Sequence, residues 1–166
     1  SGKTMSARRL ARGACRVYGG KPWLVDTQGV QSKSYAPASG ETPGGALFDF
    51  QRVELAPPYD PGAYLGALEH CVSQGARVIV VDGLSEEHEG EGGMLDMQDE
   101  EWAKHGRSNG TKWMSWIRPK RERQRFIGWL RRQELMVMFC FRAKDKLEIK
   151  KGEDPKRLGW SWIGGD

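Results

Sequence analysis

A run of four β-branched residues, Val78 to Val81, constrains the fold of this chain more than any other segment. No polar residue interrupts the run, so both faces of such a strand must be covered, which is typical of a parallel sheet between helices. The run ends in Asp82. The carboxyl ends of parallel strands form the edge at which α/β proteins bind ligands, so Asp82 is a candidate site residue. The alternative is an aspartate that only caps the following turn.

Strands and helices are expected to alternate along the chain. The segments with strand character are 21–27, which ends near an acid at Asp26, 48–55, 78–82 and 135–144, and those with helical character are 5–18, 61–74, 95–105 and 120–134. This alternation predicts one α/β domain over residues 1–166, with a mainly parallel sheet and helices on both faces. The second apolar strand, from Leu135, is expected to be buried like the first.

The helix after Asp60 has the clearest boundaries in the sequence. Asp60 stands at the N-cap position, Pro61 at the first helical position and Gly75 at the stop, with apolar residues at helical spacing between them. Residues 86–110 form a segment with several acids that is expected to be a loop, with a helix around residues 95–105. Residues 148–166 offer neither a helix stop nor a strand partner, and the segment GWSWIGGD is expected to pair as a strand when the rest of the protein is present.

The composition limits the partners and the cellular compartment expected for the protein. Its 166 residues carry a formal net charge of +4, which is compatible with nucleic-acid binding but does not demonstrate it. Three scattered cysteines, Cys15, Cys71 and Cys140, show no metal-binding spacing and favour reduced thiols over a disulfide framework. No apolar run reaches the length of a membrane span. The sequence therefore predicts a cytoplasmic protein without a membrane anchor.

The chain begins with Ser1-Gly2-Lys3-Thr4, which matches the second half of a phosphate-binding loop running into its helix. In such a loop the Lys3 ammonium neutralises phosphate oxygens, and the Thr4 hydroxyl takes a position on Mg²⁺. The tripeptide alone is a weak signal and can arise by chance at a helix start. Its combination with a buried strand ending in Asp82 favours a nucleotide site with Mg²⁺ between Thr4 and Asp82.

A basic and aromatic stretch follows the acidic segment. It contains Trp102, Trp113 and Trp116 among Lys104, Arg107, Lys112, Arg118, Lys120 and Arg121. Such a mixture can stack bases and follow the phosphates of a single strand, although two tryptophans in the core beside a charged helix start would give the same pattern. His88 stands between two glutamates, but no second histidine lies nearby, so we do not expect a zinc site there.

The segments SGKT with ARRLARG, VDTQ, VIVVDGLSEEHEGEGG and VMFCFRAK occur in an order and spacing that resemble one family. It is the RecA-like, AAA-family P-loop ATPases of phages and prophages, the single-strand annealing and recombination group. The resemblance covers nearly the whole chain. It implies a RecA-like fold in which this sequence is truncated at both ends and the first strand is missing.

The resemblance also implies roles for individual residues. Gly2, Lys3 and Thr4 would bind the ATP phosphates, and Thr4 and Asp82 would hold Mg²⁺. Arg142 and Lys144 would sense the γ-phosphate, and Lys146 would reach across a subunit boundary. The alternative for these three cations is that they are solvated charges at a strand end.

The sequence departs from the family after Asp26-Thr27. Gln28 stands where the family has a glutamate that orients the attacking water, and an amide cannot accept the proton of that water. Glu87 and Glu89 are alternative acids, unless they only form part of a solvated loop. The sequence thus predicts a Mg²⁺-dependent ATPase that turns over slowly, with single-stranded DNA and further copies of itself as partners. A non-hydrolysing, nucleotide-gated DNA-binding module and a small-molecule P-loop kinase are the other readings.

Overall fold

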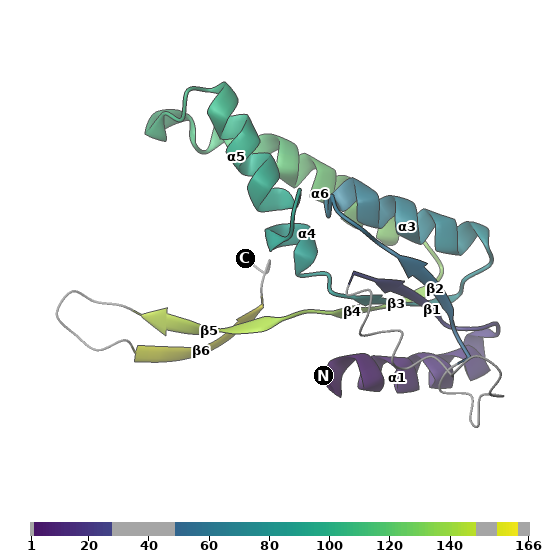
Figure 1. Cartoon of the computed structure of the whole chain (residues 1–166). Coiled ribbons are helices and arrows are strands. Elements are labelled where there is room, and N and C mark those ends of the chain that lie inside the picture. The colour runs from purple at the N-terminus through teal and green to yellow at the C-terminus, as the bar shows by residue number, and fades with distance from the viewer. Residues whose placement is uncertain (1, 28–48, 149–155, 163–166) are drawn as a thin grey trace.

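A computed structural model describes residues 2–27, 49–148 and 156–162 of the chain (Figure 1). Its helices are α1 (Gly2–Tyr18), α3 (Pro61–Ser73), α4 (Glu86–Glu89), α5 (Met94–Lys104) and α6 (Ile117–Leu130), with two 3₁₀ turns, η1 (Asn109–Thr111) and η2 (Met114–Trp116). Its strands are β1 (Trp23–Asp26), β2 (Gln51–Glu54), β3 (Val78–Asp82), β4 (Met136–Cys140), β5 (Ala143–Glu148) and β6 (Lys156–Trp162).

Four of the strands form a parallel sheet in the order β2-β1-β3-β4. In the register of this sheet Asp26 lies opposite Asp82, and Asp82 lies opposite Cys140. All four strands run the same way, so their carboxyl ends meet at one edge. The predicted α/β fold with a parallel sheet is confirmed, and the sheet brings two strand-ending aspartates side by side.

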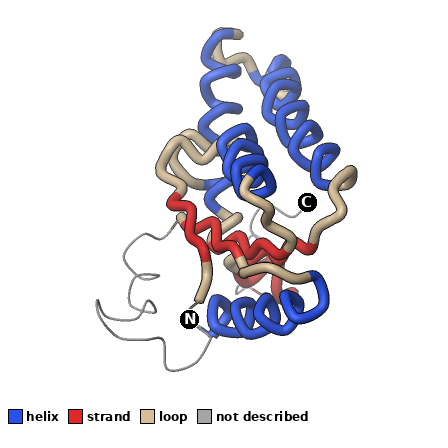
Figure 2. Tube along the Cα trace, turned by 90° about the vertical axis from the view of Figure 1, so that its right-hand side faces the viewer, coloured by secondary structure: helices blue, strands red, loops and turns tan. Residues whose placement is uncertain are grey.

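Helices cover both faces of this sheet, as expected: α1 lies on one face, and α3 and α6 lie on the other (Figures 1 and 2). Alternate residues of β3 point to opposite faces. Val80 packs in the cluster with Ala7 and Ala11 of α1, whereas Ile79 packs in the cluster with α3 and with Phe126 of α6. Every residue of β3 is buried, which explains the absence of polar alternation in its sequence.

The predicted boundaries of α3 are confirmed. The Asp60 side chain accepts a hydrogen bond from the Ala63 amide at 3.0 Å, Pro61 occupies the first turn, and Gly75 adopts a φ of +84° after the last turn. A left-handed residue is needed there to end the helix, and glycine adopts that conformation without steric cost. The helix expected over 95–105 is also present as α5, which begins and ends one residue earlier.

Three expectations need correction. First, β4 is not buried like β3: four of its five residues are only partly buried, because within the described residues it is the outer strand of the sheet. Second, the C-terminal segment does find a partner in this chain. β5 and β6 pair as an antiparallel hairpin, with Ala143 opposite Trp162 and Glu148 opposite Lys156, so strand and helix do not alternate to the end. Partners so near in sequence cost little chain entropy to bring together.

The third correction concerns the acidic segment after β3, which is more ordered than a loop. Its first acids form the single turn α4, and the chain then continues into α5.

All three cysteines are free, in agreement with the expectation of reduced thiols. Among the described helices, none combines the length and the apolar character needed to cross a bilayer.

Candidate functional site

The start of α1 meets the end of β3. The Thr4 hydroxyl donates a hydrogen bond of 2.5 Å to Asp82 Oδ2, and both residues are buried, with exposed fractions of 8% and 6%. Asp82 points to the α1 face of the sheet because it is two residues beyond Val80, which packs against α1. The two residues predicted to hold Mg²⁺ therefore lie in direct contact.

Lys3 lies beside this pair and is exposed. Its ammonium donates a 2.8 Å hydrogen bond to the backbone carbonyl of Phe141, the residue after β4. The first amides of a helix have no partner within it and carry the positive end of its dipole, so the start of α1 favours an anion. Among the described residues, nothing lies within 4 Å of the position that a Cβ would take at Gly2.

A second buried aspartate, Asp26, lies next to Asp82 at the end of β1. It has no exposed surface, and the Arg52 guanidinium of β2 donates two hydrogen bonds to its Oδ2, from Nε at 3.1 Å and from Nη2 at 2.9 Å. The sequence marks Asp26 as a strand-ending acid, but no role was predicted for it. Asp26 ends its strand just as Asp82 does, and this shared position was the sequence feature that could have identified Asp26 as a site residue. Nothing in the sequence pointed to Arg52.

The turn after β3 is packed closely against the end of β1. The Thr27 amide and hydroxyl both donate to the Asp82 carbonyl, at 3.3 and 3.2 Å. Gly83 adopts a φ of +95°, and a Cβ there would lie 2.1 Å from Thr27 Oγ1. Only glycine fits this position, which fixes the backbone that carries Asp82.

Two of the predicted catalytic residues, Arg142 and Glu89, contact each other instead of Thr4 and Asp82. The Arg142 side chain contacts Glu86 Oε1 at 2.6 Å and Glu89 Oε1 at 3.0 Å, and its backbone amide donates to Ser85 Oγ at 2.7 Å. Ser85 is fully buried. The segment after β4 is thus tied to α4 at the carboxyl edge of the sheet.

Glu87 points away from Arg142. Its side chain is almost fully buried and lies 3.5 Å from Arg123 of α6, as an ion pair. Burial raises the pKa of the Glu87 carboxyl above its usual range, and the charge of Arg123 partly opposes this rise. The alternative in which Glu87 belongs to a solvated loop is therefore wrong. Among the described contacts, none joins this carboxylate to Thr4 or Asp82.

The remaining predicted site residues are placed only in part. Gln28 lies outside the described residues. Lys144 and Lys146 lie on β5, opposite Ser161 and Gly159 of β6. They therefore belong to the two-stranded hairpin and not to the parallel sheet that ends in Asp82.

The donor atoms at the Thr4–Asp82 contact fit Mg²⁺, which prefers oxygen and takes one or two carboxylates together with substrate phosphates. In the part of the chain that the structure describes, no group of three or more His, Cys, Asp and Glu residues could hold a metal by itself. A Mg²⁺ ion at Thr4 and Asp82 would therefore need further oxygens from a bound phosphate compound and water.

The basic and aromatic stretch spreads over α5, the 3₁₀ turns and the start of α6. Lys112 lies 4.9 Å from the centre of the Trp102 ring, Arg118 pairs with Glu101 at 3.1 Å, and His88 stacks on Trp116. Trp113 remains two-thirds exposed. Lys104 and Arg107 also form ion pairs, with Glu101 and Asp99. Internal contacts thus occupy two of the three tryptophans and four of the six cations.

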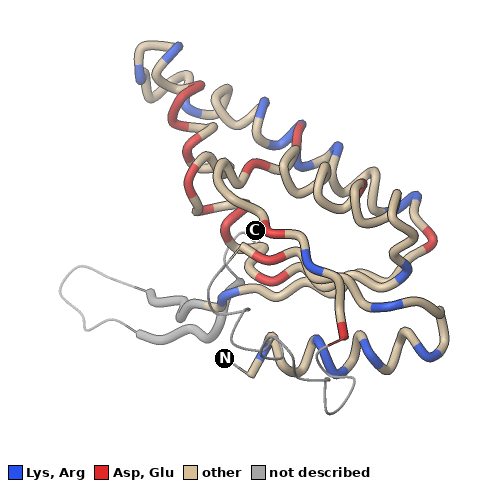
Figure 3. Tube along the Cα trace, turned by 45° about the vertical axis from the view of Figure 1, so that its right-hand side comes forward, with Lys and Arg blue, Asp and Glu red and all other residues tan. Residues whose placement is uncertain are grey.

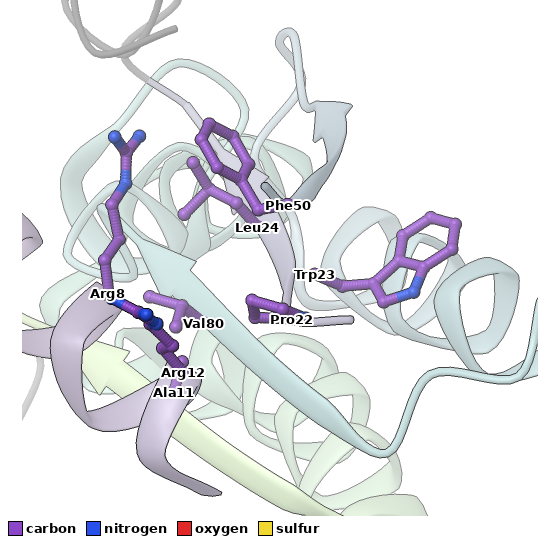
Figure 4. A pocket seen from close by; sticks show the side chains of 8 residues that line it. All are labelled: Arg8, Ala11, Arg12, Pro22, Trp23, Leu24, Phe50 and Val80. Atoms are coloured by element: carbon purple, nitrogen blue, oxygen red, sulfur yellow. The ribbon is translucent and has the colours of Figure 1, made fainter. Parts of the chain in front are cut away.

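A small pocket lies on the α1 face near the start of β1 (Figure 4). It is lined by Arg8, Ala11, Arg12, Pro22, Trp23, Leu24, Phe50 and Val80, and the Arg8 guanidinium lies 4.5 Å from the centre of the Phe50 ring. The pocket adjoins the amino end of β1, whereas Thr4 and Asp82 meet at the carboxyl end of β3, so the two are separate features.

Three comparisons with known proteins complete the description of the site. No protein-family model matches the chain, and neither the curated proteins nor the solved structures searched contain a match. The fold and the contacts at the carboxyl edge therefore carry the functional argument.

Proposed function

We propose that this chain is a RecA-like P-loop ATPase that binds ATP with Mg²⁺ at the junction of α1 and β3. The observation that carries the proposal is the buried hydrogen bond from Thr4 to Asp82, with Lys3 as the next residue. A lysine and a hydroxyl residue at a helix start, opposite an aspartate that ends a buried parallel strand, are the protein groups that a P-loop site needs.

Each of these residues has a definite task in the proposal. The Lys3 ammonium would exchange the Phe141 carbonyl for phosphate oxygens, and the free amides at the start of α1 would add hydrogen bonds to the same anion. Thr4 and Asp82 would hold Mg²⁺ with their oxygens. When bound, Mg²⁺ and ATP supply charge neutralisation and the phosphoryl group that water attacks. Gly83 and Thr27 keep Asp82 in place.

Hydrolysis also requires a group that orients or deprotonates water. Glu89 is engaged by Arg142, Glu87 by Arg123, and Asp26 by Arg52. Each of these acids thus already contacts an arginine in the described structure, and none of them contacts Thr4. This observation favours the second candidate function, a module that binds nucleotide and does not hydrolyse it.

The association with single-stranded DNA in phage-type recombination or annealing, and the assembly into homo-oligomers, belong to the same proposal. They rest on the sequence resemblance.

The test is a titration with a fluorescent ATP analogue, with and without Mg²⁺, followed by phosphate release. We expect Mg²⁺-dependent binding that falls at least tenfold in Lys3→Ala and in Asp82→Asn. Lys21→Ala is the matched control, because Lys21 is an exposed lysine that pairs with Asp49. Equal binding by the wild type and Lys3→Ala would overturn the nucleotide site. Binding without phosphate release would select the non-hydrolysing candidate.

A further inference from the structure

The outer face of α1 carries a row of arginines. Ala7 and Ala11 face the sheet, whereas Arg9 and Arg16 are exposed on the side turned away from it. Arg12 is half-buried at the flank of the helix and also lines the pocket beside Leu24. Figure 3 shows the basic positions that recur along α1. The helix contains no acidic residue. Among the described residues, none of these three arginines forms an ion pair, in contrast to Arg52, Arg118 and Arg142. Their charges are therefore available to a partner.

These three side chains surround a depression in the surface. Arg9, Arg12, Gly13 and Arg16 line an open hollow of about 290 Å³. Nothing lies within 4 Å of the position that a Cβ would take at Gly13, so the floor of the hollow is open space. A small anionic group placed over Gly13 would be within reach of several guanidinium groups, which bind phosphate through paired N–H donors.

Two exposed apolar side chains lie beside the hollow: Leu10 is 64% exposed and Val17 is 81% exposed. From Arg9 to Arg16 the helix rises about 10 Å, a length that two to four phosphates of one strand can follow. The bases of an unpaired strand can rest on neighbouring apolar and aromatic side chains, whereas the bases of a duplex are stacked inside it.

We propose that the outer face of α1 is a docking surface for single-stranded nucleic acid, with the arginines of the row on its phosphates and Leu10 and Val17 beside its bases. Arg9, Gly13 and Arg16 are exposed on the side of α1 turned away from the sheet, and the surface does not coincide with the basic and aromatic stretch around α5 and α6. The inference stands independently of nucleotide binding at Lys3 and Thr4.

The first experiment measures fluorescence anisotropy of a labelled oligothymidylate of about 20 nucleotides over a series of salt concentrations. We expect Arg9→Gln/Arg12→Gln/Arg16→Gln to weaken binding at least tenfold and to reduce the salt slope by about 2, because each phosphate contact on a single strand contributes about 0.7. The matched control is Arg77→Gln/Arg131→Gln/Arg132→Gln, which removes the same charge from exposed positions near the amino edge of the sheet. It should keep the wild-type slope to within about 0.7.

A second pair of variants separates the hollow from the fold of the helix. Gly13→Ala leaves the hollow nearly open and should bind the oligonucleotide like the wild type. Gly13→Glu places a carboxylate among the guanidinium groups and should weaken binding at least tenfold, with an unchanged circular dichroism spectrum. Equal binding by Gly13→Ala and Gly13→Glu would overturn the proposal.

Three further outcomes would also overturn it. The first is loss of binding in Lys120→Gln/Arg121→Gln/Arg125→Gln while the α1 triple variant binds fully. The second is equal affinity for duplex and single strand, and the third is binding to anionic vesicles without binding to the oligonucleotide. Lys3→Ala distinguishes this surface from the nucleotide site, since it should lose ATP and retain the oligonucleotide.

Discussion

Thr4 and Asp82 are separated by 78 residues in the sequence, and their side chains are joined by a hydrogen bond of 2.5 Å in the fold. The contact links the first turn of α1 to the last residue of β3, so it depends on the packing of the helix against the sheet. A carboxylate that is buried needs such a partner, because its transfer from water is costly. The pair is therefore a structural element as well as a candidate Mg²⁺ site.

Replacement of Thr4 by valine should destabilise the fold. Valine keeps the shape of the side chain but removes the hydroxyl, so the buried Asp82 carboxylate loses a donor, which costs about 1–3 kcal/mol. Thr4→Ser retains the hydroxyl and should lose less. Urea denaturation measures both free energies of unfolding. Thr111→Val is the control, since the Thr111 hydroxyl donates to Ser108 at an exposed position. Equal stability of Thr4→Val and Thr4→Ser would contradict the role assigned to the hydrogen bond.

The Arg52–Asp26 pair should contribute far more to stability than an exposed ion pair. The Asp26 side chain is fully buried and that of Arg52 is 20% exposed, so Arg52→Leu leaves a buried carboxylate without its main cation. We expect a loss of about 3–5 kcal/mol in thermal or urea unfolding. Lys21→Leu removes the cation of the half-exposed pair with Asp49 and should cost less than about 1 kcal/mol.

A double variant tests the same pair from the other side. Asp26→Asn/Arg52→Leu removes both charges and should recover part of the stability lost in Arg52→Leu alone. A double variant no more stable than Arg52→Leu would show that the uncompensated charge is not the cause.

Local patterns in the sequence predicted the core of the fold. The unbroken β-branched run gave β3 and its burial, and Asp60, Pro61 and Gly75 gave the limits of α3, because each of these signals acts on its own neighbourhood. The contact between Thr4 and Asp82 could also be expected, since strand ends and helix starts meet at the carboxyl edge of a parallel sheet.

Features that depend on distant partners could not be predicted in the same way. Glu87 is buried because α6 carries Arg123 over it, and no local pattern distinguishes Glu87 from the neighbouring Glu86 and Glu89. β4 resembles β3 in composition, but its burial depends on its position in the strand order. The pairing of β5 with β6 was missed because β5 is polar and contains few of the residues that favour strands, so it did not stand out as a partner for the GWSW segment.

Glu87 should make the stability of the protein depend on pH. Its pKa is raised in the folded state from the reference value of 4.5, chiefly by burial. A raised pKa means that the folded state binds the proton more tightly than the unfolded state. The contribution of Glu87 is therefore fully present below about pH 4.5 and is lost as the pH rises through the folded-state pKa.

Glu87→Gln should remove this dependence, because the amide does not ionise. We expect the variant to unfold at higher urea concentration than the wild type at pH 7, by on the order of 1 kcal/mol, and the difference to shrink below about pH 4.5. Glu91→Gln changes the same functional group at an exposed position and is the control. If the advantage of Glu87→Gln grew toward acid pH, the assigned sign of the linkage would be wrong.

The reactivity of Cys140 should report the charge of Asp82. Burial, together with the neighbouring Asp82 carboxylate, raises the pKa of the Cys140 thiol to about 11. Asp82→Asn removes that charge, so the pH profile of alkylation at Cys140 should move to lower pH. The experiment uses a Cys15→Ser/Cys71→Ser background and iodoacetamide, with mass spectrometry as the readout. Cys71 supplies the control in a Cys15→Ser/Cys140→Ser background. Burial also raises its pKa to about 11, without a contribution from Asp82, so its profile should not move. An equal shift at both thiols would indicate general loosening of the fold rather than a charge at the Thr4–Asp82 contact.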